Sequence, residues 1–302
     1  MTTSAIIIAD SITPSGQRIT TFQLRFWRAI LPELNTHRVF SRNTASTRAI
    51  PVKAMITNIR KDPAMPLHWG QNQPGMQASD ELTPFKRKLA KTLWLSAMWV
   101  ATFFASIGAK LGMHKQTIGR ILEPFAHSST VVTSTEWSNF YALRRHPDAQ
   151  PEIKALADAM FAAHQASTPK LLGAGEWHLP YIQEKDRDDA TAFIEENPTF
   201  ALPTRFVEDL PFEIDHKTQY LLAVSVARCA RISYKLHDGI TTSFDSDIKL
   251  YARLLAAQPL HASPAEHQAA PLHLLTGKDS HNWSGNLRGV VQFRKILSGE
   301  TM

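Results

Sequence analysis

The segment from Thr36 to Arg48 (THRVFSRNTASTR) stands out because its side chains could bind a phosphate or a planar ring. Within 13 residues it carries four cationic or titratable side chains among short polar ones: His37, Arg38, Ser41, Arg42, Asn43, Ser46, Thr47 and Arg48. An arginine fork contacts two phosphate oxygens at once, and its plane stacks on heterocycles. A solvated basic loop has the same composition. However, an apolar stretch before the segment and Pro51 after it anchor both ends, which favours a binding site.

Other catalytic patterns are missing from the sequence. The GAG at 173–175 lacks the third glycine of a dinucleotide-binding fingerprint, and there is no GxxxxGK[ST], HExxH or GxSxG motif. His261 and His267 are six residues apart and do not share a helical face, so we expect no metal site there. The single cysteine, Cys229, excludes a disulfide framework, and its apolar neighbours predict a buried, unreactive thiol.

The elements that must hold the segment are predicted from the apolar pattern. Residues 4–12 and 17–25 are typical of two strands joined by the turn TPSG. Residues 25–38 predict a helix that Pro32 kinks or ends early. Its apolar face is formed by Phe26, Ile30 and Leu34. Residues 36–80 then read as a long polar loop, and such loops are more often functional than idle.

Helices dominate the rest of the chain, so we expect an α+β fold with a small mixed or antiparallel sheet. The expected helices cover 81–112, 116–124, 134–145, 149–168 with Asp148 as N-cap, 216–235 and 244–257, before a compact tail at 261–298. Between them, 171–214 is expected to be a linker or an insertion, with six acids from Glu184 to Glu196.

One stretch, Thr92 to Ala109, has no charged residue. It is shorter than the roughly 20 apolar residues that span a bilayer. It also continues an amphipathic pattern and contains Ser96 and Thr102. We therefore expect a helix buried in the core or in an oligomer interface, and no membrane partner.

Composition narrows the class of protein. A hydrophobic fraction of 43% excludes a disordered chain. The 33 Lys and Arg against 27 Asp and Glu give a net charge of +6, which suits nucleotides or nucleic acid. The first nine residues lack a secretion signal, and we expect a reduced, cytoplasmic location.

The Thr36–Arg48 segment resembles the signature of flavin-dependent thymidylate synthases: Arg-His-Arg, two spacers, Ser, a spacer, Asn-Glu, a spacer, Ser, a spacer, Arg. This chain keeps six signature residues at the same spacing: His37, Arg38, Ser41, Asn43, Ser46 and Arg48. Thr36 replaces the first arginine, and Thr44 replaces the glutamate. The preceding TTFQLRFWRAILPELN is similar to the strand and helix that lead to the signature in that family.

Further stretches carry the same resemblance. DAQPEIKALADAM (148–160) is similar to the family's Ala-Gln-x-Glu-Ile-Arg helix, with Lys154 in place of the arginine. GRILEPF and NFYALR resemble the segments that precede that helix. ARISY (230–234) and SPAEH (263–267) resemble motifs that the family carries before its signature, whereas here they follow it. The resemblance therefore implies a circularly permuted member of the family.

That interpretation divides the chain into three parts. Residues 1–170 are the nucleotide- and flavin-binding part, with a helical insertion at 52–112. Residues 171–214 are the linker or insertion, and 215–302 are the permuted part, packed into the same domain. Termini that lie at a domain surface make such a rearrangement physically tolerable.

The resemblance implies a homotetramer that shares its active sites between subunits. It also implies FAD as cofactor, with methylenetetrahydrofolate and NADPH as co-substrates, and delivery of a one-carbon unit to C5 of dUMP without an enzyme cysteine. The residues assigned to flavin and folate are His37, Arg38, Ser41, Asn43, Asn139, Ser263 and His267. Those assigned to the nucleotide are Glu33, Thr36, Thr44, Ser46, Arg48, Arg120 and Lys154, of which Ser46, Arg48 and Lys154 are also the candidate catalytic residues.

Departures from the pattern lie near the base rather than the phosphate. Glu33 stands where glutamine is usual, and Thr36, Thr44 and Lys154 are also changed, while Ser46 and Arg48 are kept. This favours the same nucleotide class with an altered base or product. The alternatives are thymidylate synthesis, a dCMP or dUMP 5-hydroxymethylase serving modified DNA, and a non-catalytic relative that binds nucleotide or nucleic acid.

Overall fold

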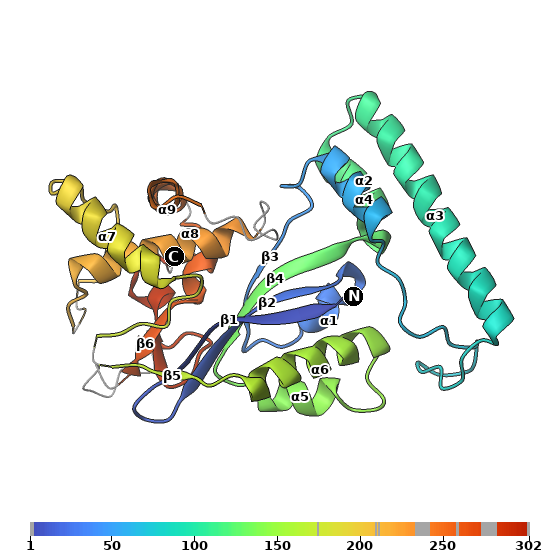
Figure 1. The fold of residues 1–302 in the computed structure, drawn as a ribbon, viewed down its shortest axis with the longest axis horizontal. Helices are drawn as coiled ribbons and strands as arrows, with labels where there is room; N and C mark the ends of the chain where they lie inside the picture. The colour runs from blue at the N-terminus through green and yellow to red at the C-terminus, as the bar shows by residue number, and fades with distance from the viewer. Residues whose placement is uncertain are drawn as a thin grey trace.

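The computed structural model describes residues 3–173, 175–208, 210, 212–232, 242–257, 260–272 and 283–300. At its centre lies a mixed sheet of strand order β3-β4-β2-β1-β5, with helices on both faces (Figure 1). The strands are β1 (Ser4–Ile12), β2 (Arg18–Trp27), β3 (Ser41–Thr44), β4 (His127–Ser134) and β5 (Lys170–Leu171). Only the β1–β5 pair is parallel. The expected α+β class is confirmed.

The first two strands form where the sequence predicts them. β1 and β2 pair antiparallel, and the turn between them is closed by a hydrogen bond from Thr13 N to Gln17 O (2.9 Å). Gly16 has a φ of 85°, a conformation that a side chain would strain. Alternation along β2 sends Phe22 and Leu24 to one face of the sheet, and Ile19 to the other.

The helix expected over 25–38 is wrong in type. β2 continues to Trp27, and only η1 (Arg28–Ile30) and the single turn α1 (Leu31–Leu34) are helical. Pro32 lies in the first turn of α1, where a missing N–H costs nothing. The three apolar residues still share one core, because a strand end followed by a helical turn places them on the same side: Phe26, Ile30 and Leu34.

One further prediction for this half is wrong, because the expected loop at 36–80 contains β3 and the helix α2 (Val52–Lys61). The helix expected at 134–145 forms as the shorter α5 (Ser138–Arg144), after the strand β4, which the sequence did not predict. Both strands are rich in Ser and Thr, so they lack the apolar alternation that marks a strand. Their hydroxyls are paired inside the sheet instead, as in the 2.7 Å contact between Thr21 Oγ1 and Thr133 Oγ1.

One face of the sheet is covered by α5 and α6 (Pro151–Ala166) (Figure 1). Ile153, Leu156 and Met160 of α6 pack on the β2 side chains. The prediction that Asp148 caps this helix is wrong. The N-cap is Gln150, without a side-chain bond, and Pro151 starts the helix.

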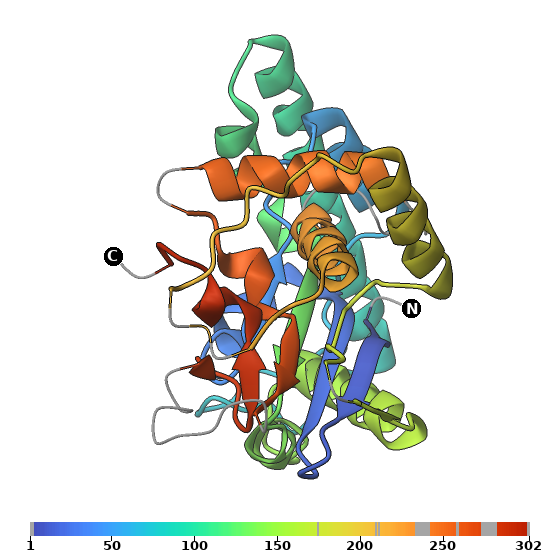
Figure 2. The ribbon, with the colours of Figure 1, turned by 90° about the vertical axis from the view of Figure 1, so that its left-hand side faces the viewer.

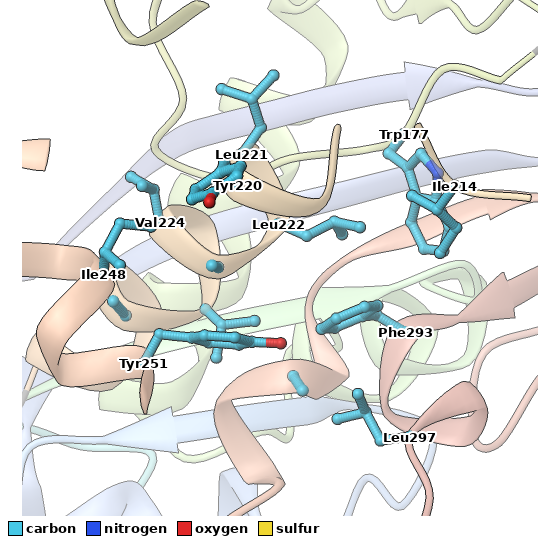
Figure 3. Packing of buried hydrophobic residues seen from close by; sticks show 14 of the residues in the cluster. Trp177, Ile214, Tyr220, Leu221, Leu222, Val224, Ile248, Tyr251, Phe293 and Leu297 are labelled. Atoms are coloured by element: carbon cyan, nitrogen blue, oxygen red, sulfur yellow. The ribbon is translucent and has the colours of Figure 1, made fainter. Parts of the chain in front are cut away.

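A second core is built from the chain after residue 171. It packs α7 (Glu184–Glu196), α8 (His216–Arg231) and α9 (Phe244–Ala256) around a cluster that includes Tyr220, Tyr251 and Phe293. Figure 3 shows Tyr251 pointing toward Phe293. The acid-rich part of 171–214, expected to be a linker or an insertion, forms the packed helix α7. Its Asp186 is buried because it pairs with Arg228 (2.6 Å).

The C-terminal segment returns to the face of the sheet opposite α5 and α6 (Figure 2). It forms η4 (Ser263–Glu266), β6 (Ala269–Pro271), β7 (Val290–Gln292) and η7 (Phe293–Ile296). Ala269 and Val290 pack on Ile19 of β2, and Cys229 packs on Val131 of β4. ARISY is described only to residue 232, so its last two positions lie outside the described residues.

A third cluster joins α2, α3 (Pro84–Lys110) and α4 (Lys115–Leu122), with η2 (Glu123–Phe125) leading into β4. α3 lies at the edge of the molecule (Figure 1). By length and composition alone, α3 could cross a membrane. In the described structure only 22% of its most apolar stretch of 18 residues is buried. Of the two expected locations for this helix, the core and an oligomer interface, the core is therefore wrong.

Candidate functional site

The loop after β3 holds Ser46 and Arg48 against α4. Ser46 Oγ accepts from the Arg48 backbone N (3.3 Å), and Ser46 O accepts from Ala49 N (2.9 Å), so the loop is a closed turn. On the α4 side, a side chain at Gly119 would come within 3.3 Å of Thr47, so the loop packs closely on the helix here. Arg48 itself is exposed.

Arginines gather around one carboxylate beside this turn. Glu123 Oε1 accepts from Arg28 Nε (3.2 Å) and from Arg120 Nη1 (3.2 Å), and it lies 3.5 Å from Thr47 Oγ1. Arg120 remains largely exposed. The guanidinium groups of Arg28 and Arg120 thus meet one carboxylate, and Arg48 lies exposed on the adjoining turn. Such an excess of positive charge on a tight turn suits a phosphate dianion.

A cavity of about 320 Å³ lies on the other side of the same loop. Its lining includes Ala45 and Thr47 but neither Ser46 nor Arg48. Thr47, which also lies 3.5 Å from Glu123 Oε1, is therefore shared by the cavity and the arginine cluster.

A second cluster forms around Arg144, at the end of α5. Its guanidinium donates to Glu33 Oε1, to His37 Nε2 (3.0 Å) and to Thr36 Oγ1 (3.3 Å). The His37 ring lies 4.9 Å, edge on, from Phe140. Burial, and then the charges of Arg144 and Arg42, lowers the pKa of His37 to about 4. A neutral His37 accepts from Arg144, so the histidine holds the arginine in place.

A third cluster lies where β3 meets the C-terminal segment. The Ser41 hydroxyl accepts from Asn286 Nδ2 (3.0 Å) and Gln292 Nε2 (3.2 Å). Asn43 Nδ2 donates to the backbone O of Cys229 (3.2 Å). Gln292 also donates to the backbone O of Glu266 (3.0 Å) and so joins η4 to β3.

A chain of buried polar side chains runs below this third cluster. Thr21 Oγ1 lies 2.8 Å from His178 Nε2 and 2.7 Å from Thr133 Oγ1, and Thr133 Oγ1 lies 2.8 Å from His267 Nδ1. Ser11 Oγ, 2.9 Å from His178 Nδ1, ends the chain on the other side. Burial lowers the pKa of both histidines to about 3, so both rings are neutral.

These neutral histidines predict a loss of stability in mild acid. The folded pKa values are about 4 for His37 and about 3 for His178 and His267, against 6.5 in the unfolded chain. Below pH 6.5 these histidines are protonated in the unfolded chain but remain neutral in the folded chain. The free energy of unfolding therefore falls as the pH falls toward 4. The slope is up to about 1.4 kcal/mol per pH unit for each histidine.

Urea unfolding at a series of pH values between 7.5 and 4.5 measures this slope. His146 provides the matched control, because its side chain is exposed and paired only with Asp148. His146→Gln should leave the slope unchanged. A free energy of unfolding that stays constant over this range would contradict the assignment of neutral, buried rings.

The remaining predicted residues are not joined to these clusters by described contacts. Lys154 pairs with Asp158 on α6 (2.7 Å), and Thr44 Oγ1 lies 3.1 Å from Thr130 Oγ1. Arg38 and Asn139 are exposed, and Ser263 is half-buried.

The donor set fits a phosphate-bearing cofactor only in part. Arg38 and Asn139, which the resemblance assigns to the flavin, are exposed and able to reach a bound group. His37, Ser41 and His267 are buried and hydrogen-bonded within the chain, so they shape the site rather than line it. No group of three or more potential metal ligands is found among the residues that the structure describes.

Sequence reasoning missed Arg144 and the partners of Ser41. Arg144 closes the NFYALR stretch, so the signal for it was a motif arginine beside a helix. Asn286 and Gln292 carry no such signal, because they lie about 250 positions from Ser41 and only folding brings them there.

The buried thiol agrees with the sequence. Cys229 is fully buried, and burial raises the pKa of its thiol far above neutral pH. Gln268 Nε2, 3.6 Å from Sγ, is its polar neighbour. We expect Cys229→Ser to fold and to keep any catalytic turnover within about twofold, because a thiol held protonated is no nucleophile. A folded but inactive variant in a steady-state assay would contradict this.

Comparison with known proteins gives one family. The model described as thymidylate synthase complementing protein matches residues 13–170, which contain the loop after β3, α4 and Arg144. Two solved structures are similar. One is a UMP/dUMP methylase, PolB from Streptomyces cacaoi, bound with 5-Br UMP (18% identity, 54% of this chain and 88% of that chain, TM-score 0.46). The other is thymidylate synthase X (ThyX) from Helicobacter pylori with FAD and dUMP (14%, 48% and 67%, TM-score 0.34). No curated protein sequence matches the chain.

Proposed function

Because the chain belongs to the family of thymidylate synthase complementing proteins, we propose that it transfers a one-carbon unit to C5 of a pyrimidine deoxynucleotide. The observation that carries this proposal is the arginine cluster on the turn of Ser46 and Arg48. It lies inside the matched range and brings the guanidinium groups of Arg28 and Arg120 to one carboxylate, next to the exposed Arg48. The default reaction is the conversion of dUMP to dTMP.

In this proposal the nucleotide phosphate binds to Ser46, Arg48 and Arg120. These residues sit on a closed turn and a helix, so their backbone loses little conformational entropy on binding. Glu33 and Thr36, fixed by Arg144, face the base with Lys154, while Thr44 lies at the end of β3 between the two groups. The roles of Lys154 and Thr44 rest on the family resemblance alone.

FAD is the proposed cofactor, with methylenetetrahydrofolate and NADPH as co-substrates. When bound, the flavin supplies the redox chemistry that the protein's side chains lack. Arg38 and Asn139 would contact it directly, while His37, Ser41 and Asn43 keep the signature strand in shape. Ser263 and His267 would border the same region through η4.

The circular permutation, the homotetramer and the cytoplasmic location belong to this proposal too. Support for the permutation comes from η4, which carries SPAE and packs beside β3 of the signature, joined to it through Gln292. Active sites shared between subunits would explain why Lys154 and Ser263 lie apart from the arginine cluster within one chain.

A 5-hydroxymethylase acting on dCMP or dUMP is the second candidate. Glu33 places a carboxylate beside the base-side cluster, and a carboxylate accepts a hydrogen bond from the amino group of cytosine. In that reaction water, rather than hydride, completes the C5 methylene intermediate. A non-catalytic nucleotide- or nucleic-acid-binding relative is the alternative of another class.

The first experiment is the visible absorption spectrum of the protein after incubation with FAD and desalting. A retained oxidised-flavin spectrum is expected. Turnover of dUMP and of dCMP with methylenetetrahydrofolate and NADPH, read by mass spectrometry, then separates methyl from hydroxymethyl products. A colourless protein without measurable flavin affinity would refute the enzyme and leave the binding relative.

A further inference from the structure

The outer face of α3 is the largest apolar surface that the described chain leaves uncovered. Nine large apolar side chains on the helix and its C-cap are between 38% and 78% exposed: Phe85, Leu89, Leu93, Trp99, Val100, Phe103, Phe104, Ile107 and Leu111. Single exposed apolar residues are ordinary, but a continuous patch of this size marks an interaction site.

The exposed residues form one stripe along the helix. Steps of three or four residues connect Phe85, Leu89, Leu93, Ser96, Val100, Phe103, Ile107 and Leu111. This spacing keeps side chains on one side of a helix and is typical of a seam between two packed helices. The small side chains of Ser96 and Ala97 lie at the middle of the stripe, where they permit close approach.

The opposite face of α3 is already occupied. Met98, Thr102 and Ala105 are buried in the cluster with α2 and α4, and Trp94 Nε1 donates to Ala64 O (2.9 Å). Arg60 donates to Thr102 Oγ1 (3.1 Å) and covers Trp99 with its guanidinium, 4.9 Å from the ring centroid. These contacts fix the rotation of α3, so its apolar stripe cannot turn inward.

We propose that this stripe packs against the same stripe of a second copy of the chain, with the two α3 helices antiparallel. At roughly 150–250 Å² for a large side chain, the exposed fractions of the nine residues amount to on the order of 1,000 Å². A stable interface buries about 800 Å² on each partner. The stripe alone therefore meets the requirement of a lasting dimer.

The antiparallel direction follows from symmetry and charge. The midpoint between Phe85 and Leu111 is Met98, one residue from the small Ala97, so a two-fold axis there pairs one end of the stripe with the other. Four cations lie in the first two turns: Lys86, Arg87, Lys88 and Lys91. An antiparallel pair places the two cationic clusters at opposite ends, whereas a parallel pair would bring them together.

A membrane fits these observations less well. A helix that crosses a membrane alone contacts lipid around its whole circumference, but one side of α3 is packed on α2 and α4. A helix lying on a lipid surface carries cations along its length, while here Thr92 to Ala109 has none.

This inference deepens the proposed oligomer and rests on that part of the proposed function, but its test reads mass rather than nucleotide chemistry. Light scattering after size exclusion measures the full chain and the double variant Leu93→Glu/Phe103→Glu. We expect the wild-type mass to be an even multiple of the 33.8 kDa chain and the variant mass to be half of it. Leu143→Glu, on an equally exposed leucine of α5, should leave the mass unchanged.

Disulfide trapping in a Cys229→Ser background tests the direction. A cross-linked dimer is expected when Phe85→Cys and Leu111→Cys proteins are mixed and oxidised, but not from either alone. Cross-linking in one protein alone, or in no sample, would overturn the antiparallel pair. A monomeric wild type in lipid-free buffer would overturn the second copy, and co-sedimentation of that monomer with phosphatidylserine vesicles would assign the stripe to a membrane surface. Loss of flavin or nucleotide binding with the mass retained would instead affect only the proposed function.

Discussion

Replacing Asp247 by alanine should lower the free energy of unfolding by about 3–5 kcal/mol, the cost of breaking a buried ion pair. Asp247 is fully buried on α9. Its carboxylate accepts from Arg228 Nε (2.9 Å), Arg231 Nε (2.8 Å) and Thr242 Oγ1 (2.6 Å). Without it, Arg231 loses its carboxylate, and Arg228, itself buried, keeps Asp186 of α7 and the backbone O of Tyr181.

Asp245→Ala is the matched control on the same helix. Asp245 is exposed and pairs with Lys249 four residues on (2.6 Å), so its removal should cost no more than about 0.5 kcal/mol. Guanidinium-induced unfolding of both variants gives the comparison. Equal stability of the two would show that the Asp247 network does not hold α8 and α9 together.

The second large effect is on the arginine cluster. Arg48→Ala should weaken nucleotide binding about 10- to 100-fold, since a charge-assisted hydrogen bond contributes about 1.5–3 kcal/mol. The fold should be spared, because Arg48 is exposed and its backbone forms the turn contact with Ser46. Calorimetric titration with dUMP and with dCMP measures the affinity.

A ligand without a phosphate and a control variant test whether the effect is specific to Arg48 and the phosphate. Deoxyuridine lacks the phosphate, so its binding should be the same in wild type and in Arg48→Ala. Arg187→Ala, which removes an arginine of α7 paired only with Glu184 in the described contacts, should leave dUMP affinity unchanged. Equal dUMP affinity in wild type and Arg48→Ala would remove Arg48 from the binding site.

The candidate site shows which of its properties a contiguous sequence motif can predict. The signature residues from His37 to Arg48 are contiguous, so their spacing alone indicated a phosphate-binding segment and a family that the match over 13–170 confirms. Their individual roles stay predictions. The structure adds a contact to His37 that the sequence did not indicate, because its ring accepts a hydrogen bond from Arg144.

The errors in predicting strands and helices arose where polar side chains are paired with residues far away in the sequence. β3 and β4 were missed because hydroxyl-rich strands in the middle of a sheet satisfy their side chains with each other, which leaves no apolar alternation to read. The acid-rich α7 was taken for a linker because the partner that buries Asp186, Arg228, lies 42 residues away.

The sequence by itself determined what depends on near neighbours: the β1–β2 strand pair with its turn, the signature segment and the unreactive Cys229. Tertiary structure alone decided what depends on distant residues. Arg144 meets Glu33 across 111 positions, and Ser41 meets Gln292 across 251. It also decided that the apolar stripe of α3 faces outward, because an apolar pattern records that a helix face avoids water but not which surface covers it.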